Sequence, residues 1–414
     1  MQTALTHNAC ADAWREAHAA RCGGAESLAR ALVAARARTL MLAQAYESHL
    51  GPALRVPQQP DLNLPLWELG HVGWFQDWWV ARNPQRHLGI HADPDHARLA
   101  ARVANADDCY DSSRVAHARR WSLSLPDSRA TRAELAASLE ETLQLLARTN
   151  HDDQSLHFFR LVLLHEDMHA EAAAYMAQAL DIPLPIDAPL RSPGAATGSQ
   201  RRFSAGPWTL GYGDSGFAFD NELRAHAVEL DGTEIDATPV CWAQYLAFVE
   251  AGGYRQRQCW SADGWAWRKS RLPGDGPRYL RRDPKGGWEQ QSFGHWHASD
   301  PQADAIHLSW FEADAWCRWA GRRLPDEAEW ERAAVTDPAF HWGTVWEWTA
   351  SSFVAYPGFE AHPYRDYSMP WFGSRKVLRG GCWATSARIA RPAYRNFFSP
   401  DRSDVFAGFR TCAL

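Results

Sequence analysis

Two histidines, His165 and His169, stand four residues apart in the stretch 161–176, which reads Leu-Val-Leu-Leu-His-Glu-Asp-Met-His-Ala-Glu-Ala-Ala-Ala-Tyr-Met. Apolar residues recur there at helical spacing and no Gly or Pro interrupts the stretch, so we predict a helix. Residues four apart lie on one face of a helix, so both imidazoles can share one metal ion. Imidazole nitrogens suit zinc, iron, copper or nickel, and suit magnesium and calcium poorly.

The same five residues spell the zinc-protease pattern H-E-x-x-H, in which Glu166 would be a general base. Zinc proteases of this kind need a third ligand further along the chain. The residues after His169 carry no H-x-x-G-x-x-H extension, and Glu171 follows too closely to fold back as a ligand. A zinc hydrolase and two unrelated histidines stay open as alternatives. Glu166 could orient one of the metal-binding imidazoles, but we interpret both Glu166 and Asp167 as solvated helix residues.

A third histidine, His71, lies in the middle of an aromatic stretch, 66–81, that also reads as a helix. Taken alone, a histidine among apolar neighbours is more often part of the core. Helical bundles, however, build metal sites from side chains on facing helices. A metal ion bound by three histidines would keep coordination positions open for substrates, which is typical of a catalytic rather than a structural metal site.

The sequence around these histidines predicts two parts that differ in secondary structure. Amphipathic helices are expected at 26–49, 66–81 and 132–148, and from Asp153 or Ser155 through the histidine pair, after a loose lead-in over 1–24. They would form a four-helix bundle with a long crossover within residues 1–182. A Pro-rich and small-residue linker follows at 183–200. Residues 201–414 hold short β-like runs with helices at about 241–251 and 311–321, so the class is α+β.

Composition bounds the partners and the compartment. The net charge of −6 gives no basic footprint, which argues against nucleic acid and an anionic membrane as partners. The sequence contains no run of 18 apolar residues, so we expect no membrane span. The first residues lack the pattern of a signal peptide. Eight cysteines are scattered without a C-x-x-C pair, so we expect reduced thiols and a cytoplasmic protein. The 22 tryptophans suit aromatic-lined pockets and cation–π contacts.

The C-terminal part carries a dense set of aromatic, Gly and acidic motifs, at 234–254, 307–331, 343–349 (Gly-Thr-Val-Trp-Glu-Trp-Thr), 378–383 (Leu-Arg-Gly-Gly-Cys-Trp) and 408–410 (Gly-Phe-Arg). Together they resemble the formylglycine-generating-enzyme (sulfatase-modifying factor) fold, a variant of the C-type lectin fold. The helical part resembles the DinB-like four-helix bundle. Cys382 and Cys412 do not restore the copper-binding cysteine pair of that enzyme, so no copper is expected.

In this order the two parts resemble the ergothioneine-synthase class of non-haem iron sulfoxide synthases, which includes the EgtB and OvoA branches and the selenoneine-making SenA branch. The resemblance implies that His71, His165 and His169 bind Fe(II) and that dioxygen is a co-substrate. It implies hercynine, or trimethyl-histidine, as the imidazole substrate and a small-molecule selenium or thiol donor. Fe(II) would hold the substrates together for bond formation, a proximity effect.

Substrate contacts in this class follow an Arg-Asn dipeptide near the C-terminus, here 395–402. By resemblance, Asn396 would hold the betaine end of hercynine, Phe397 would offer an aromatic face to the quaternary ammonium, and Arg402 would contact the donor. Phe398 stands where enzymes that use γ-glutamylcysteine have an acidic residue. Packing in the hydrophobic core is an alternative to a substrate contact for Phe398, and we weigh the two equally. Met168 stands where those enzymes have Gln.

Tyrosines are the expected proton or electron donors in this class, and the candidates are Tyr364 and Tyr367, with Tyr110 and Tyr356 behind them. Tyr110 also begins the stretch 110–114, which matches the substrate-contacting segment of the cysteine-using branch but lacks its paired tyrosines.

These departures favour a donor other than an amino-acid thiol, namely a selenosugar, and so a selenoxide formed on the way to selenoneine. The alternative is an EgtB-type hercynine sulfoxide synthase that uses cysteine or γ-glutamylcysteine. A zinc hydrolase is a lower alternative. A pure binding module stays open as well, because a lectin-like fold alone does not give chemistry.

Overall fold

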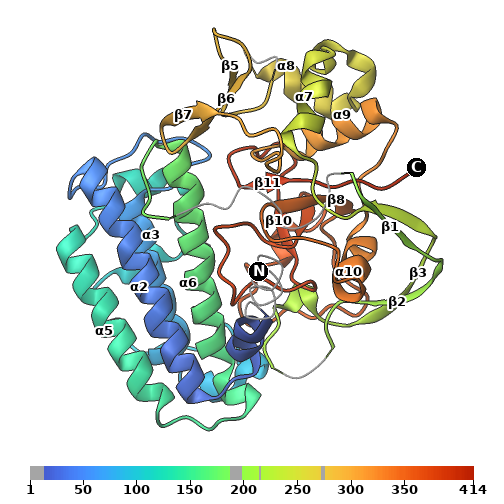
Figure 1. The fold of residues 1–414 in the computed structure, drawn as a ribbon. Helices are drawn as coiled ribbons and strands as arrows, with labels where there is room; N and C mark the ends of the chain where they lie inside the picture. Colours follow the sequence, from blue (N-terminus) through green and yellow to red (C-terminus); the bar gives the residue numbers. More distant parts are fainter. Residues whose placement is uncertain (1–13, 187–197, 214–215, 272–275) are drawn as a thin grey trace, which may run out of the picture.

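A computed structural model describes residues 14–186, 198–213, 216–271 and 276–414. It has two parts that lie against one another (Figure 1): a helical half, up to residue 186, and a C-terminal half, from residue 198. The α+β class predicted from the sequence is confirmed. Most of the predicted linker, residues 187–197, lies outside the described residues.

Four long helices build the helical half: α2 (Ala25–Leu50), α3 (Pro65–Gln76), α5 (Ser128–Leu146) and α6 (Asp153–Ala179). Proline at the first position of α3 needs no backbone N–H there. The carboxylate of Asp152 accepts a hydrogen bond from the backbone N–H of Ser155 (2.8 Å), which caps α6 one residue before the predicted start. The helices pack in pairs, α2 on α6 and α3 on α5. The predicted helices of this half are therefore confirmed.

Two details of the helical half differ from the sequence prediction. Residues 14–22 are helical, where a loose lead-in was predicted, and the buried Arg21 of this segment donates hydrogen bonds to the backbone carbonyls of Arg388 and Ile389. The far end of the 66–81 helix widens into a π-helical turn, Asp77–Ala81. The connection between α3 and α5 contains only the short helix α4 (Ala106–Tyr110) and two 3-10 turns.

The described residues of the C-terminal half form four small sheets and four α-helices. The central sheet has the strand order β10-β9-β8-β11, and the others pair β1 with β4, β2 with β3, and β5-β6-β7. The strands are β1 (Gln200–Phe203), β2 (Gly206–Leu210), β3 (His226–Leu230), β4 (Thr233–Asp236), β5 (Leu280–Arg282), β6 (Trp288–Ser292), β7 (His295–Ala298), β8 (Trp346–Ser352), β9 (Lys376–Arg379), β10 (Asn396–Phe398) and β11 (Ala407–Gly408). The helices are α7 (Trp242–Glu250), α8 (Ala262–Ser270), α9 (Trp310–Ala320) and α10 (Glu327–Thr336). The predicted helices correspond to α7 and α9, whereas α8 and α10 were not predicted.

Side chains of α6 join the two halves. Asp167 forms a two-pronged ion pair with Arg388 (2.6 and 2.8 Å). Glu171 accepts hydrogen bonds from the Trp346 indole and the Thr385 hydroxyl, both at 2.6 Å. These contacts hold α6 against the C-terminal half, so one face of α6 lies at the junction between the two halves.

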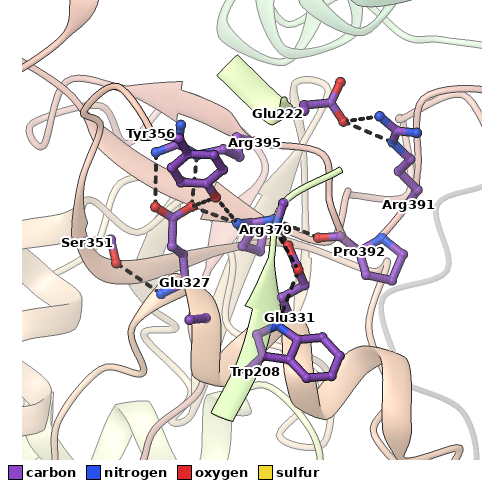
Figure 2. A network of polar contacts seen from close by, with 12 residues as sticks. Trp208, Glu222, Glu327, Glu331, Ser351, Tyr356, Arg379, Arg391, Pro392 and Arg395 are labelled. Carbon is purple, nitrogen blue, oxygen red and sulfur yellow. Dashed lines mark hydrogen bonds and ion pairs between the residues drawn. The ribbon is translucent and has the colours of Figure 1, made fainter. Parts of the chain in front are cut away.

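A buried ionic network holds the core of the C-terminal half (Figure 2). Glu327 of α10 accepts hydrogen bonds from Arg395 (2.9 and 3.0 Å), from Arg379 (2.7 Å) and from the Tyr356 hydroxyl (3.1 Å). Arg379 also pairs with Glu331 (2.9 Å). Burial makes such pairs costly to break, because an unpaired charge would be left in the interior. Arg395 is thereby fixed, and Asn396, the first residue of β10, follows it directly.

Each described helix is too short or too polar to span a lipid bilayer.

Candidate metal centre

The three predicted histidines meet in one cluster between α3 and α6. The Nε2 atom of His165 lies 3.3 Å from Nε2 of His71 and 3.2 Å from Nε2 of His169. Their candidate ligand atoms all lie within 4.8 Å of one another, and among the described residues this is the one group of at least three such side chains that could hold a metal ion. His71 comes from α3, and the other two follow one turn apart on α6, as their spacing predicts.

Hydrogen bonds on the outer side of the rings fix how two of them face the centre. The Nδ1 atom of His71 lies 2.8 Å from the backbone carbonyl of Tyr110, and the Nδ1 atom of His169 contacts the carboxylate of Glu68. Both partners accept hydrogen bonds, so each Nδ1 carries the proton and each Nε2 presents a lone pair. The Nε2 lone pairs of His71 and His169 therefore turn toward the His165 ring, where a cation could be bound.

Burial favours the uncharged form of His71 and His165. It lowers the pKa of His71 to about 3, with the neighbouring His169 adding to the effect and Glu68 opposing it. Burial, with the other two histidines, also places the pKa of His165 well below its ordinary value. Burial by itself would raise the pKa of Glu68, but His169 outweighs it and the pKa falls to about 2. Neutral imidazoles backed by a carboxylate are the ligand set of a transition metal.

Aromatic rings hold the histidines in place. Phe75 stacks on His165 with a centroid distance of 3.5 Å, and Trp67 stacks on His71 at 4.7 Å. Residue 70 must be glycine, because a Cβ there would lie 2.2 Å from the ring of Tyr110. Rigid neighbours of this kind pre-set the ligand geometry before a metal binds.

A cavity of about 790 Å³, here called the metal pocket, opens beside His165 and His169 at the junction of the two halves. Its wall includes most of the residues predicted to contact substrates or supply protons, namely Met168, Tyr364, Tyr367, Asn396, Phe397 and Phe398. These residues come from α6, from the loop before β9 and from β10. Residues far apart in sequence are therefore brought to one site.

The walls of the metal pocket are aromatic and hold no unpaired charge among the described residues. Glu171 is the one carboxylate in the wall, and both its oxygens are occupied by Trp346 and Thr385. Phe397 stacks on Phe353 with a centroid distance of 4.0 Å. Asn396 accepts a hydrogen bond from the backbone N–H of Phe397 (2.9 Å), which leaves its amide NH₂ without a partner in the described chain.

The two candidate tyrosines have different surroundings. The Tyr367 hydroxyl lies 2.9 Å from the Tyr394 hydroxyl and 3.6 Å from the Met168 sulfur. The Tyr364 ring packs edge-on against Phe75, with centroids 4.9 Å apart. In the described part of the chain its hydroxyl has no hydrogen-bond partner. Burial raises the pKa of both phenols, so both stay protonated at neutral pH.

Three predicted residues lie outside the wall of the metal pocket. The Tyr110 ring is buried against Gly70 and Trp67, and its backbone carbonyl rather than its phenol serves the site. Arg402 forms a two-pronged ion pair with Asp404, both contacts at 2.6 Å, and lies over the ring of Phe398. Tyr356 belongs to the ionic network of Figure 2 and is not among the residues of the pocket wall.

Glu166 and Asp167 are buried, so the prediction that they are solvated is wrong. Glu166 forms a two-pronged ion pair with Arg36 of α2 (2.7 and 3.1 Å), and Asp167 pairs with Arg388. Neighbouring residues on a helix point in different directions, so Glu166 turns away from the face of its neighbour His165. A carboxylate held in this way is not free to act as the general base of a zinc protease.

Two residues of the site were missed from the sequence. Glu68 precedes His71 by three residues on the same helix and so shares its face, a signal that the spacing did contain. Tyr394 stands two residues before Asn396, in a segment without regular periodicity, and no pattern distinguished it from a core tyrosine.

Comparisons with known proteins agree with this architecture. Residues 199–342 and 340–413 match the sulfatase-modifying factor enzyme 1-like domain, which confirms the predicted identity of the C-terminal part. The formylglycine-generating enzyme of Streptomyces coelicolor is 27% identical and matches 55% of this chain and 95% of its own.

Similarity to a second group extends through both halves. The hercynine oxygenase of Mycolicibacterium thermoresistibile is 32% identical, and the match covers 92% of this chain and 94% of that enzyme. The hercynine oxygenase of Mycobacterium tuberculosis is also 32% identical, with 93% and 98% covered. The match thus includes the helical half with its three histidines as well as the sheets, and the chain belongs to the hercynine oxygenase family.

Proposed function

We propose that this protein is a non-haem iron enzyme that uses dioxygen to join a chalcogen atom of a small donor to the imidazole carbon of hercynine. The observation that carries the proposal is the convergence of three imidazole rings beside an aromatic pocket. Family membership supports hercynine as substrate. In the overall reaction the donor X–H and the imidazole C–H each lose one hydrogen, the chalcogen gains one oxygen atom, and the second oxygen atom leaves as water.

The donor set fits a divalent iron. Three nitrogen ligands on one side leave positions open toward the metal pocket, as oxygen-activating iron sites require. When bound, Fe(II) would supply the activation of dioxygen, which the protein side chains alone cannot provide. Glu68 would hold His169 and the Tyr110 carbonyl would hold His71 in the ligating orientation, which strengthens metal binding.

The remaining residues would position hercynine beside that centre. A quaternary ammonium has no hydrogen to donate, so it is held best by aromatic faces such as that of Phe397. The unpartnered amide of Asn396 can donate to the hercynine carboxylate. Binding both substrates in one pocket replaces a bimolecular encounter by an oriented approach.

Between the two candidate tyrosines, we assign proton donation to Tyr364. Its hydroxyl is unengaged by the described residues, whereas that of Tyr367 is held by Tyr394 and Met168. Tyr364→Phe should therefore lower turnover about 100-fold or more, the usual contribution of a positioned acid. Tyr367→Phe should cost much less. Equal losses would contradict the assignment.

The donor can be proposed from the charge of the pocket. An amino-acid thiol carries an ammonium group that needs a carboxylate, and both oxygens of Glu171 are already occupied. Phe398 offers no replacement. Aromatic faces and phenol groups suit a neutral, hydroxylated donor, so the selenosugar stays our proposed donor. Family membership supports the alternative, a sulfoxide synthase that uses cysteine or γ-glutamylcysteine, more directly than it supports selenium.

A zinc hydrolase is the competing interpretation of the H-E-x-x-H segment. It requires Glu166 as a base, and the ion pair with Arg36 argues against that role. Glu166→Gln should leave oxygen-dependent turnover of the folded protein within a few-fold of wild type. Activity that needs no oxygen and is abolished by this change would favour the hydrolase. Binding of hercynine without any turnover would favour a binding module.

The decisive test is a competition. The protein is loaded with Fe(II) and hercynine without oxygen, and air is admitted with a selenosugar, a thiosugar, cysteine and γ-glutamylcysteine together. We expect the selenium–imidazole product to dominate. Predominance of a cysteine adduct would replace the selenosugar by the alternative donor, and no product with any donor would overturn the proposed function.

A further inference from the structure

The segment between β9 and β10 forms part of the wall of the metal pocket, although it contains neither a helix nor a strand. This wall segment, residues 384–394, contributes Ile389 and Tyr394 to the pocket and is followed by Arg395 and then by Asn396. A segment without a helical or sheet ladder of hydrogen bonds depends on its neighbours for its position. The contacts around it therefore decide where this wall lies relative to the three histidines.

Helix α6 contacts both the metal centre and the wall segment, through two pairs of residues with the same spacing. His165 and His169, one turn apart, belong to the metal centre. Asp167 and Glu171, also one turn apart, bind the wall segment. A packed helix is a rigid element, so the two imidazoles and the two carboxylates keep fixed positions relative to one another. The wall segment is therefore positioned by the same helix that supplies two of the three histidines.

The ion pair of Asp167 with Arg388 differs in geometry from the other contacts to the wall segment. Both oxygens of the fully buried Asp167 accept hydrogen bonds from the Arg388 guanidinium, at 2.6 and 2.8 Å. A two-pronged pair of this kind fixes direction as well as distance. Arg21 and Arg38 donate instead to backbone carbonyls of the segment, which accept hydrogen bonds over a broad range of directions. The ion pair therefore constrains the wall segment more strictly than these carbonyl contacts do.

A second ion pair between the two halves provides a comparison. A carboxylate oxygen of Asp61 lies 3.2 Å from a guanidinium nitrogen of Arg278, and the two side chains are 40% and 29% exposed. The side chains of Asp167 and Arg388 are 0% and 13% exposed. Water screens an exposed pair and leaves it little effect, whereas a buried pair is costly to break. We therefore expect the two pairs to differ in their effect on the site, although both link the same two halves.

We infer that Asp167 and Arg388 are positioning residues, whose ion pair holds the wall that receives hercynine at a fixed distance from the metal centre. This inference rests on the proposed function. If the wall shifts by about 1 Å, bond formation at the imidazole carbon should slow about 100-fold, and dioxygen then oxidises the donor alone. Two donor molecules lose their X–H hydrogens and join through an X–X bond, and dioxygen takes up both hydrogens as hydrogen peroxide. The ion pair itself exchanges neither protons nor electrons.

The test compares Asp167→Asn and Arg388→Lys with the matched control Asp61→Asn, which breaks the exposed pair between the same halves. Iron-loaded full-length protein is assayed in air with hercynine and the best donor, and oxygen consumption without protein is subtracted. In Asp167→Asn, the product formed per dioxygen consumed should fall at least about fivefold, because the wall is misplaced. Iron bound per folded molecule should stay unchanged. Arg388→Lys keeps the charge and should keep part of this ratio, and Asp61→Asn should keep all of it.

A double variant separates positioning from stability. Asp167→Asn alone leaves the Arg388 charge without its partner, which destabilises the fold. Adding Arg388→Met removes that charge, so the free energy of unfolding should recover, whereas the product formed per dioxygen consumed should stay low. Recovery of this ratio together with stability would show that the pair acts through stability alone, and would overturn the inference.

A readout without turnover measures the position of the substrate directly. With Co(II) in place of iron and without oxygen, the paramagnetic relaxation of the hercynine N-methyl protons reports their distance from the metal. This rate varies steeply with distance, so a shift of about 1 Å should change it about twofold or more in Asp167→Asn, and Asp61→Asn should match wild type. Either an unchanged relaxation rate or a wild-type ratio of product to dioxygen in Asp167→Asn would overturn this inference alone. Absence of wild-type turnover with every donor would instead overturn the proposed function.

Discussion

The histidine cluster and the ionic network of the C-terminal half are both buried and polar, yet they differ in how their groups are satisfied. In the network of Figure 2, Glu327 faces Arg379 and Arg395, so positive and negative charges neutralise one another. In the cluster, three imidazole rings turn their Nε2 atoms toward a common point. The charges of the network are balanced by its own residues, whereas the ring nitrogens of the cluster converge where a cation could be bound.

This difference distinguishes buried polar groups that stabilise the fold from buried polar groups that are available to bind a ligand. The network fixes Arg395 next to the strand that carries Asn396 and Phe397, and both of its carboxylates are paired with arginines. Aromatic rings, a carbonyl and a carboxylate hold the cluster from outside, and two of its histidines line a cavity. Burial and polarity alone would not have distinguished the two regions.

The largest expected effect comes from removing a ring at the centre of the cluster. His165→Ala should reduce bound iron to the level of a metal-free sample and turnover to background, because two ligands rarely hold a catalytic ion. His157→Ala is the matched control, since His157 is a buried histidine of the same helix outside the cluster. Iron analysis and circular dichroism make the comparison. Full iron content in His165→Ala would show that the cluster is not the metal site.

The network should respond in stability rather than in metal binding. Glu327→Gln leaves Arg379 and Arg395 with an uncompensated charge and should lower the free energy of unfolding by about 3–5 kcal/mol. Urea denaturation measures this loss. Iron bound per folded molecule should not change, and a loss of iron without a loss of stability would reverse the roles assigned to the two regions.

The same carboxylate predicts a pH dependence. Burial by itself would raise the pKa of Glu327, but Arg395 and Arg379 outweigh it and hold the pKa below its ordinary value. Such a group stabilises the fold above its unfolded pKa, about 4.3, and this contribution is lost as the pH falls. Unfolding free energies measured from pH 7 down to pH 3 should therefore fall more steeply in wild type than in Glu327→Gln. Parallel curves would contradict the pairing.

A smaller effect is expected from the outer side of the cluster. Glu68→Gln keeps the size of the side chain but removes the charge behind His169, and it should weaken metal binding about 10- to 100-fold. Titration with Fe(II) without oxygen, or with Co(II), measures the affinity. Glu26→Gln, an exposed change on α2, is the control. Unchanged affinity in Glu68→Gln would mean that the carboxylate does not support the ligand.

The smallest expected effect concerns the donor. Phe398→Asp would place a carboxylate at the wall of the metal pocket, where an ammonium group could pair with it. We expect kcat/KM for cysteine or γ-glutamylcysteine to rise about tenfold relative to the selenosugar, the equivalent of one charge-assisted hydrogen bond. Steady-state kinetics with each donor measures the ratio. An unchanged ratio would indicate that charge at position 398 does not select the donor.

Much of the helical half could be predicted because its physics is local. Apolar periodicity placed the four long helices, and the four-residue spacing of His165 and His169 is confirmed by their adjacent rings. The short strands and α10 were harder, because their stability comes from pairings distant in sequence, such as Glu327 with Arg395. The burial of Glu166 could not be foreseen either, since its partner Arg36 lies 130 residues away.

Some residues of the site could also be predicted from the sequence, and others could not. The residues of the metal pocket came from a resemblance and are brought together by the fold, whereas the role of Tyr110 changed from side chain to backbone. A backbone carbonyl has no sequence signature. The hydrogen bond that distinguishes Tyr367 from Tyr364 likewise comes from Tyr394, whose position only the folded chain reveals.

The central claim is that the three histidines hold an iron that uses dioxygen to modify the imidazole of hercynine. It is tested most directly with hercynine that carries deuterium on the imidazole carbon between the two nitrogens. Iron-loaded protein with this substrate and a donor should stay inactive without oxygen and, in air, should release one deuteron for each dioxygen consumed and each product formed. Product formation without oxygen, or a product that keeps its deuterium, would contradict the account.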